Sequence, residues 1–160
     1  MPECGPTRER VRDYPRPPRI ETVLRPVRIV FAEQTVAETG AALRVLETFH
    51  PPTYYLPLAA FLPGVLQPVA GTSFCEWKGH SRYWSIAADG RVAYKAAWGY
   101  PDPSPAYAAL RDHIAVYAGL MDACFVGAER VRPQPGGFYG GWITDDLVGP
   151  FKGEPGTAFW

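Results

Sequence analysis

Short apolar runs alternate with turn residues along most of the chain, a pattern that predicts strands rather than long helices. The run VRIVFA (27–32) is followed by VAET (36–39) across a tight connection at Glu33-Gln34, which predicts a first hairpin.

The next segments are predicted to be short as well. ALRVLETF (42–49) is ambiguous, because its residues alternate like a strand while Ala and Leu favour a helix. Gly40 and Pro51 bracket so few residues that we interpret this segment as a strand. TYYLP (53–57) is predicted to be extended, and LAAFLPGVL (58–66) to hold one helical turn.

The clearest local signal is the hairpin SRYWSIAADGRVAYKAAWGY (81–100), in which Asp89-Gly90 is a preferred two-residue type I′ turn. Such a turn fixes the register, so the expected pairs are Ala88 with Arg91, Ile86 with Ala93, Trp84 with Lys95, and Arg82 with Ala97. The more apolar face, expected to point inward, carries Tyr83, Ser85, Ala87, Val92, Tyr94, Ala96 and Trp98. Trp84 would then point outward, within cation–π reach of Lys95 and Arg82.

Beyond this hairpin, Pro101 and Pro103 break the pattern, and Ser104 is placed to cap a short helix beginning at Pro105. MDACFVG (121–127) and FYGGWIT (138–144) are predicted as later strands. The fold class is therefore mainly β: a compact antiparallel β domain over residues 27–160 with one or two short helices.

Residues 1–26 are rich in Arg and Pro and poor in large apolar groups, so we expect a tail or an arm laid over the domain. This segment lacks the apolar core of a secretory signal, and no run approaches the ~18 apolar residues that span a bilayer. The formal net charge is 0, which gives no indication of a nucleic-acid or membrane partner. The 3 cysteines are widely spaced without a CxxC pair, so we expect no zinc site and a reduced, cytoplasmic protein.

The stretch FYGGWIT places two glycines between large apolar residues. In a strand, Phe138, Gly140 and Trp142 share one face, so the two rings would wall a slot floored by bare backbone. Two interpretations stay open for this slot. It holds a flat ligand, or it is filled by a ring from a neighbouring strand or removed by a bulge.

Lysine is scarce, and two of the lysines stand in matching triplets, Trp77-Lys78-Gly79 and Phe151-Lys152-Gly153. An ammonium on a flexible stem suits a carboxylate or phosphate, so Lys78 and Lys152 are candidate ligand-binding residues. The alternative is that both are solvated turn residues.

Three side chains, Glu47, Cys75 and Lys78, are candidates for catalysis. Cys75 lies near Lys78 and His80, either of which is able to activate a thiolate, and Cys124 is a candidate resolving thiol; the alternative is an inert buried cysteine. Glu47 precedes Tyr54-Tyr55 and is a candidate general acid or base, or a partner for Lys78, Lys152 or an arginine.

Several motifs together carry a family resemblance: VLET, PPTYYLP, SFCEWKGHSRYW, AAWGYPDP and FYGGWIT…GPFKGEPGT. From about Val27 to Trp160 the chain resembles the bacterial domain of unknown function 427, which bears a nucleotidyltransferase-like label. The resemblance implies a compact, mostly antiparallel β domain, similar to the β-tent folds but without their zinc sites, and it implies no settled activity. The sequence contains no phosphate-binding loop to match the label, and it reads LAAF (58–61) where the family often has an acidic residue.

These observations predict a β domain that binds an unknown small molecule in an aromatic cleft, with no cofactor. The expected cleft residues are Tyr55, Tyr83, Trp98, Tyr100, Tyr139 and Trp142, with Glu47, Lys78 and Lys152 supplying polarity. This hypothesis expects Trp98 and Trp142 around a concave, partly empty space. Two alternatives are a protein-interaction or homo-oligomer module that uses the same aromatic residues, and a thiol enzyme that uses Cys75.

Overall fold

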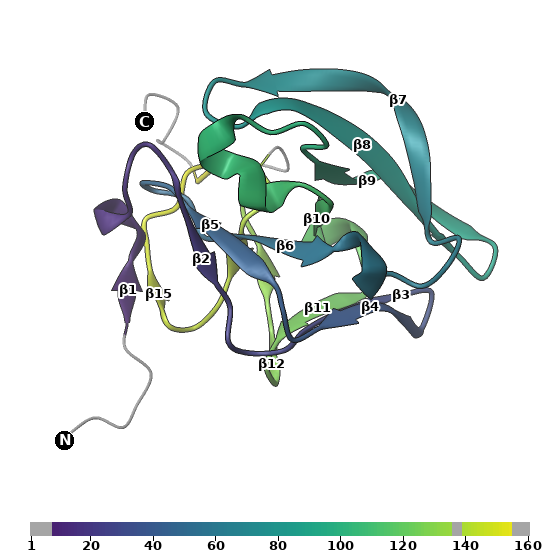
Figure 1. Cartoon of the computed structure of the whole chain (residues 1–160). Coiled ribbons are helices and arrows are strands. Elements are labelled where there is room, and N and C mark those ends of the chain that lie inside the picture. Colours follow the sequence, from purple (N-terminus) through teal and green to yellow (C-terminus); the bar gives the residue numbers. More distant parts are fainter. Residues whose placement is uncertain (1–7, 136–138, 155–160) are drawn as a thin grey trace.

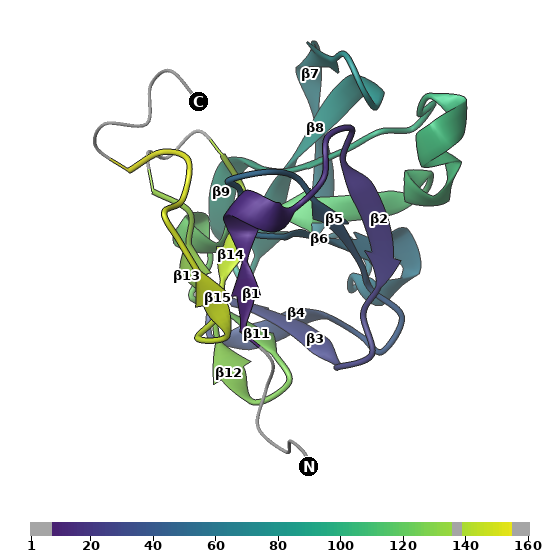
Figure 2. The same cartoon turned by 90° about the vertical axis from the view of Figure 1, so that its left-hand side faces the viewer.

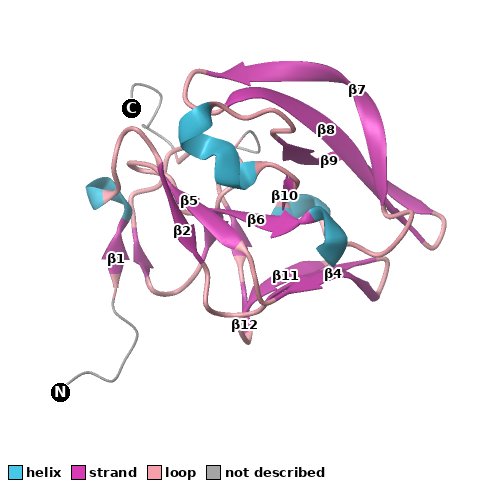
Figure 3. Cartoon of the chain, viewed as in Figure 1, coloured by secondary structure: helices cyan, strands magenta, loops and turns pink. Residues whose placement is uncertain are grey.

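The computed structural model describes residues 8–135 and 139–154 and shows a mainly β fold, as predicted from the sequence (Figures 1 and 3). The strands are β1 (Glu9–Arg10), β2 (Arg19–Thr22), β3 (Val27–Phe31), β4 (Gln34–Thr39), β5 (Leu43–Leu46), β6 (Thr53–Pro57), β7 (Leu66–Cys75), β8 (Gly79–Ala88), β9 (Arg91–Gly99), β10 (His113–Val116), β11 (Ala123–Val126), β12 (Glu129–Arg130), β13 (Arg132–Pro133), β14 (Trp142–Ile143) and β15 (Leu147–Val148). The helical segments are short 3₁₀-helices: η1 (Val11–Asp13), η2 (Leu58–Ala60), η3 (Pro105–Leu110) and η4 (Ala118–Leu120).

Two antiparallel sheets form the body of the domain. A 7-stranded sheet has the order β2-β5-β6-β10-β9-β8-β7, and a 4-stranded sheet has the order β12-β11-β3-β4. In both ribbon views the smaller sheet lies below the strands of the larger one (Figures 1 and 2). Two further ladders, the parallel pair β1–β15 and the antiparallel pair β13–β14, stand together beside these sheets in Figure 2.

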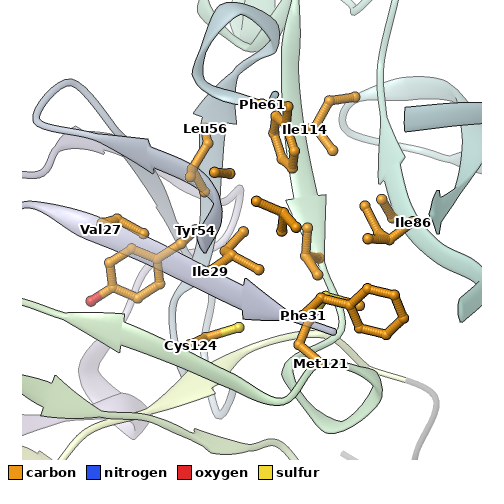
Figure 4. Close-up of a cluster of buried hydrophobic side chains, with 14 of the residues drawn as sticks. Val27, Ile29, Phe31, Tyr54, Leu56, Phe61, Ile86, Ile114, Met121 and Cys124 are labelled. Atoms are coloured by element: carbon orange, nitrogen blue, oxygen red, sulfur yellow. The ribbon is translucent and has the colours of Figure 1, made fainter. Parts of the chain in front are cut away.

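The main hydrophobic core fills the space between the two sheets. Ile29 of β3 and Cys124 of β11 meet Leu56, Ile86 and Ile114 from the larger sheet (Figure 4). These side chains are almost wholly buried, so the core accounts for much of the apolar area that folding removes from water.

The larger sheet also buries part of its other face. Neighbouring residues on β6 point to opposite sides, so Tyr54 belongs to the main core while Tyr55 belongs to a second cluster. Tyr107 and Leu110 of η3 cover part of that second face, together with Tyr100. The rest of this face forms the cleft described in the next subsection.

Most predicted strands are confirmed. The hairpin β3–β4 turns at Ala32-Glu33, beside the predicted connection, and the ambiguous segment after Gly40 forms strand β5. Strand β7 had not been predicted. It is an edge strand that contains Pro68 and a bulge between Val69 and Thr72, features typical of edges and without regular apolar alternation.

The β8–β9 hairpin confirms the predicted register near its turn and corrects it farther away. Ile86 pairs with Ala93 as expected, but an irregularity between Trp84 and Ile86 shifts the ladder, so Trp84 pairs with Ala97 instead of Lys95. Lys95 adopts a left-handed conformation with φ 51° there, and its amide donates to Ser85 Oγ at 3.2 Å. The predicted pairing of Trp84 was therefore wrong because of a bulge.

The face predicted to point inward is buried at Ala96 and Ser85, but the assignment is wrong near the turn. Ile86 is fully buried and Trp84 packs against the main core, whereas Val92 and Tyr94 are exposed. The ammonium of Lys95 lies 5.3 Å from the ring centre of Tyr83 and 5.8 Å from that of Tyr94, rather than over Trp84.

The Arg/Pro-rich segment, expected to be a tail or an arm, is built into the sheets from residue 8 onward. β1 pairs with β15, β2 pairs with β5, and Val11 is fully buried. Arg44 of β5 holds both strands, since its Nη2 lies 2.9 Å from Glu9 Oε2 and 2.8 Å from Glu21 Oε1. Burial opposes ionisation of Glu9, but the hydrogen bonds from Arg44 and Tyr14 outweigh it and lower the pKa of that carboxyl.

Two smaller expectations also differ from the structure. The helix η3 begins at Pro105 as predicted, but the side chain of Ser104 makes no capping hydrogen bond. The last predicted strand is reduced to β14, Trp142–Ile143.

A glycine in the middle of the larger sheet gives a direct test of this packing. A Cβ atom on Gly99 would lie 2.7 Å from the carbonyl oxygen of His113 and 3.1 Å from Ile114 Cδ1, whereas nothing lies within 4 Å at Gly40. We expect Gly99→Ala to lower the free energy of unfolding by about 1–3 kcal/mol, because the backbone carbonyl cannot move away. Gly40→Ala is the control, and urea unfolding should show it unchanged or slightly more stable. Equal stability of the two variants would contradict the strand contact.

Candidate functional site

A cleft of about 310 Å³ lies on the second face of the larger sheet. Strands β5, β6, β7, β8 and β9 contribute to its walls, together with the turn before β8 and the segment around Tyr139. Most of the residues nominated from the sequence line it: Glu47, Tyr55, Cys75, Lys78, Tyr83, Trp98, Tyr100 and Tyr139. Trp142 and Lys152 are not among the lining residues.

The register of the sheet explains why aromatic residues far apart in the chain meet there. Tyr83 of β8 pairs with Trp98 of β9, and Trp98 pairs with Ala115 of β10. Paired residues point to the same face of a sheet, and Ala115 belongs to the same cluster as Tyr55. The ring of Tyr117 packs on Trp98 at a centroid distance of 4.6 Å.

The buried phenols of the cleft stay neutral. Burial raises the pKa of Tyr55 well above its usual 10, and burial likewise raises the pKa of Tyr100. The charged side chains that line the cleft are Lys78 and Glu47.

The two glycines of FYGGWIT allow neighbouring groups to pack directly against the backbone. A Cβ on Gly140 would lie 2.0 Å from the ring edge of Trp98, and one on Gly141 would lie 2.5 Å from the carbonyl oxygen of Pro51. The bare backbone at Gly140 is therefore covered by a neighbouring ring, as one of the two open interpretations had it. Phe138, the expected second wall, lies outside the described residues.

Trp142 belongs to the main core and not to the cleft. It is 0% exposed, stacks on Tyr54 at a centroid distance of 5.1 Å, and donates from Nε1 to the carbonyl of Val116 at 3.0 Å. A regular strand from Phe138 onward would have placed Trp142 with the cleft residues, as expected from the sequence. The structure has only a two-residue strand here, so the alternation does not carry through.

Lys78 is the most deeply buried charged side chain of the cleft, with 8% of its surface exposed. It occupies the turn between β7 and β8, and its carbonyl accepts a hydrogen bond from the amide of Ser104 at 2.9 Å. Its ammonium lies 5.7 Å from the ring centre of Tyr100. This arrangement anchors the backbone of Lys78 and leaves its charge at the wall of the cleft.

Gln134 and His50 form a polar wall that the sequence argument missed. The side-chain oxygen of Gln134 accepts from the amide of Gly141 at 3.0 Å, and its nitrogen donates to the Lys152 carbonyl at 2.8 Å. The same nitrogen lies 3.1 Å from His50 Nδ1. An amide nitrogen only donates, so Nδ1 accepts and the His50 proton resides on Nε2.

The electrostatic surroundings of His50 agree with a neutral ring. Burial is the main cause that lowers the pKa of His50 below 6.5; Glu47 opposes it, and the positive charges of Arg16, Lys152 and Lys78 act in the same direction as burial. Gln134 follows Pro133 in a Pro/Gly-rich stretch, and no sequence pattern there indicates that it is a cleft residue. His50 lies three residues after Glu47 and was not among the candidate residues.

Hydroxyl groups complete the cleft near β7. Ser73 Oγ lies 2.6 Å from both Ser81 Oγ and the hydroxyl of Tyr83. Ser73 and Ser81 are paired across the β7–β8 ladder, so a prediction of β7 would have placed them opposite each other.

The remaining candidates, Glu47, Cys75 and Cys124, differ in their location and contacts. Glu47 Oε2 lies 3.9 Å from Arg16 Nε, which is the arginine partner named as one of its alternatives. Cys75 is partly buried at the cleft wall, whereas Cys124 is 1% exposed in the main core, where burial raises its thiol pKa to about 12. A resolving role for Cys124 would require the main core to open.

A second hollow of about 490 Å³ adjoins the cleft. The two share Tyr117, Gln134, Tyr139 and Gly140, and Lys95 lines the second one. Within residues 8–135 and 139–154, no three His, Cys, Asp or Glu side chains gather closely enough to hold a metal ion. The same part of the chain contains no helix with the length and apolar character of a bilayer span.

Comparison with known proteins gives a family and no activity. The model of a family described as a domain of unknown function (DUF427) matches residues 19–127, more than half of the chain. The match begins at β2, within the Arg/Pro-rich segment, and ends before FYGGWIT. No curated protein matches. The chain therefore belongs to the family described as a domain of unknown function, DUF427.

Proposed function

We propose that this domain binds a small planar molecule in the aromatic cleft. The observation that carries the proposal is the gathering of Tyr55, Tyr83, Trp98, Tyr100 and Tyr139 around one concavity of about 310 Å³. That volume lies at the lower end of the range typical of ligand pockets, roughly 300–1,000 Å³. Aromatic walls with a few convergent polar groups are the usual composition of such pockets.

The cleft has the rigidity that ligand binding favours. The edge of Trp98 rests on the bare backbone of Gly140, and Tyr117 packs against the same indole. A wall fixed before binding loses little conformational entropy when a ligand arrives. The Nε2–H of His50 and the hydroxyls of Ser73 and Tyr83 supply directional contacts at the rim.

A protein-interaction module is the alternative from another class. Its support is the exposure of Phe74, Val92 and Tyr94 on strands β7 and β9, each by about two-thirds of its surface. Phe74 pairs with His80 and Val92 pairs with Ala87, at opposite ends of β8 and roughly 23 Å apart at 3.3 Å per residue. These side chains are too far apart for one compact patch, so the cleft has the stronger support.

Two tyrosines that both contact the ammonium of Lys95 provide a matched test of ligand binding in the cleft. Tyr83 lines the cleft and Tyr94 is exposed, yet both rings lie below the ammonium of Lys95. Bicyclic aromatic compounds should raise the unfolding temperature more than their fully saturated analogues do. We expect Tyr83→Ala to weaken this binding by about 1–2 kcal/mol, roughly five- to thirty-fold, and Tyr94→Ala to leave it unchanged.

Isothermal titration gives the affinities, and light scattering on the same samples gives the oligomeric state. If the saturated analogues bind as tightly as the aromatic compounds, the proposal is wrong. A dimer that Tyr94→Ala disrupts would favour the interaction module instead.

Cys75 reports on occupancy of the cleft. Because its thiol lies at the wall while Cys124 is buried in the core, iodoacetamide should modify Cys75 much faster than Cys124 in the folded protein. A bound aromatic compound should slow the modification of Cys75 only, as measured by peptide mass spectrometry. If Cys75 reacts faster than free cysteine near neutral pH, the thiol-enzyme alternative gains support; if ligand leaves its rate unchanged, the ligand does not occupy the cleft.

The neutral state of His50 predicts a pH dependence of stability. Because folding lowers its pKa, the unfolded state takes up the proton first, and stability falls as the pH drops below about 6.5. We expect His50→Asn, whose side-chain oxygen can accept the bond from Gln134, to reduce this acid loss. Urea unfolding at pH 7.5 and 5.5 measures the difference, and parallel curves for both proteins would contradict the assignment.

A further inference from the structure

Lys78 combines deep burial with the absence of a carboxylate partner among residues 8–135 and 139–154. Only 8% of its surface is exposed, and the ion pairs of the described residues do not include it. Its ammonium lies over the face of Tyr100, 5.7 Å from the ring centre.

This state is unfavourable in the free protein. A buried charge is normally paired, and a cation–π contact replaces only part of the lost hydration. Glu47 lines the same cleft, but its carboxylate lies beside Arg16 at 3.9 Å and forms no ion pair with Lys78. The carboxylate in the cleft is thus directed to the N-terminal segment, and the ammonium of Lys78 is left to face the cleft.

The backbone around Lys78 is fixed, and this fixes the point from which its side chain extends into the cleft. The Lys78 carbonyl is bonded to the Ser104 amide at 2.9 Å, and Trp77 packs on the second hydrophobic cluster. Gly79 has φ 106°, and a Cβ there would lie 3.5 Å from the carbonyl oxygen of Asp102. The turn is therefore docked on the loop before η3, and this docking sets where the ammonium lies.

We propose that the molecule bound in the cleft carries an anionic group, a carboxylate or a phosphate, that pairs with the ammonium of Lys78. The inference rests on the proposed function and adds the ligand's charge to its planar shape. The anion pairs with the ammonium of Lys78 where it is open to the cleft, while the rings of Tyr83, Trp98 and Tyr100 contact the planar part of the ligand. The neutral His50 adds an N–H donor without competing for the anion's charge.

Lys95 provides the matched control. Its ammonium also lies over aromatic rings, but it lines the adjoining hollow instead of the cleft. Lys78→Met and Lys95→Met each remove one positive charge, so they change the net charge equally. A difference between them reports on position and not on overall electrostatics.

Three probes that share one ring system separate shape from charge: 2-naphthoate, 2-naphthyl phosphate and the neutral 2-naphthamide. We expect at least one of the two anions to bind the wild-type protein more tightly than the amide does. Lys78→Met should weaken binding of that anion about 30-fold or more, as expected when one member of a buried charge pair is removed. It should leave the amide nearly unchanged, and Lys95→Met should leave all three affinities unchanged, as measured by isothermal titration.

The outcomes distinguish this inference from the function on which it rests. If the amide binds as tightly as both anions and Lys78→Met changes none of the affinities, the anion is overturned while the planar-ligand proposal stands. If none of the probes binds up to its solubility limit, both proposals fail for this ring class. Preference between the two anions identifies the carboxylate or the phosphate, and either preference supports the inference.

A second measurement needs no ligand. A charge retained for binding lowers the stability of the free protein, so Lys78→Met should unfold at the same or a higher temperature than the wild type. A clear fall in the unfolding temperature of Lys78→Met would instead assign Lys78 a structural role.

Discussion

The central constraint of this domain is that one sheet must bury both of its faces. Tyr54 and Tyr55 are adjacent on β6, and strand geometry sends them to opposite sides. The side that holds Tyr54 meets the smaller sheet over a broad, closely packed core (Figure 4). Among the described residues, the side that holds Tyr55 is covered by η3 and loops, which leave part of the face open. An aromatic-lined hollow is the consequence, and the cleft occupies it.

The loop that carries the two glycines ties the cleft to the core. Trp142 is locked in the core by its bond to Val116 and its stack on Tyr54, while Gly140, two residues earlier, admits the edge of Trp98. Gln134 then bonds the amide of Gly141, the Lys152 carbonyl and His50, so one side chain joins three segments. The glycines are thus needed because a side chain at either position would displace Trp98 or Pro51. Their effect on binding is indirect, since they fix the wall and do not themselves form a slot.

The sequence could predict those elements whose signals are local. The turn Asp89-Gly90 and the apolar run before Glu33 led to correct hairpins, and the aromatic motifs led to most of the cleft residues. The pairing of the β8–β9 hairpin beyond Ile86 could not be predicted, because the bulge at Lys95 shifts the ladder and no sequence pattern indicates it. Strand β7 was missed because an edge strand has no need of apolar alternation, and Gln134 was missed because two of its partners, His50 and Lys152, are distant in sequence.

The two aromatic-lysine-glycine triplets show how one local geometry serves two purposes. Gly79 and Gly153 have nearly the same positive φ, 106° and 105°, so both triplets end in a turn that a side chain would strain. At Lys152 the backbone is the connecting part, since its amide bonds Phe49 and its carbonyl accepts from Gln134. At Lys78 the backbone carbonyl bonds Ser104, and the buried side chain faces the cleft. The triplet therefore encodes a fixed backbone, and the surrounding fold decides whether its ammonium meets the cleft.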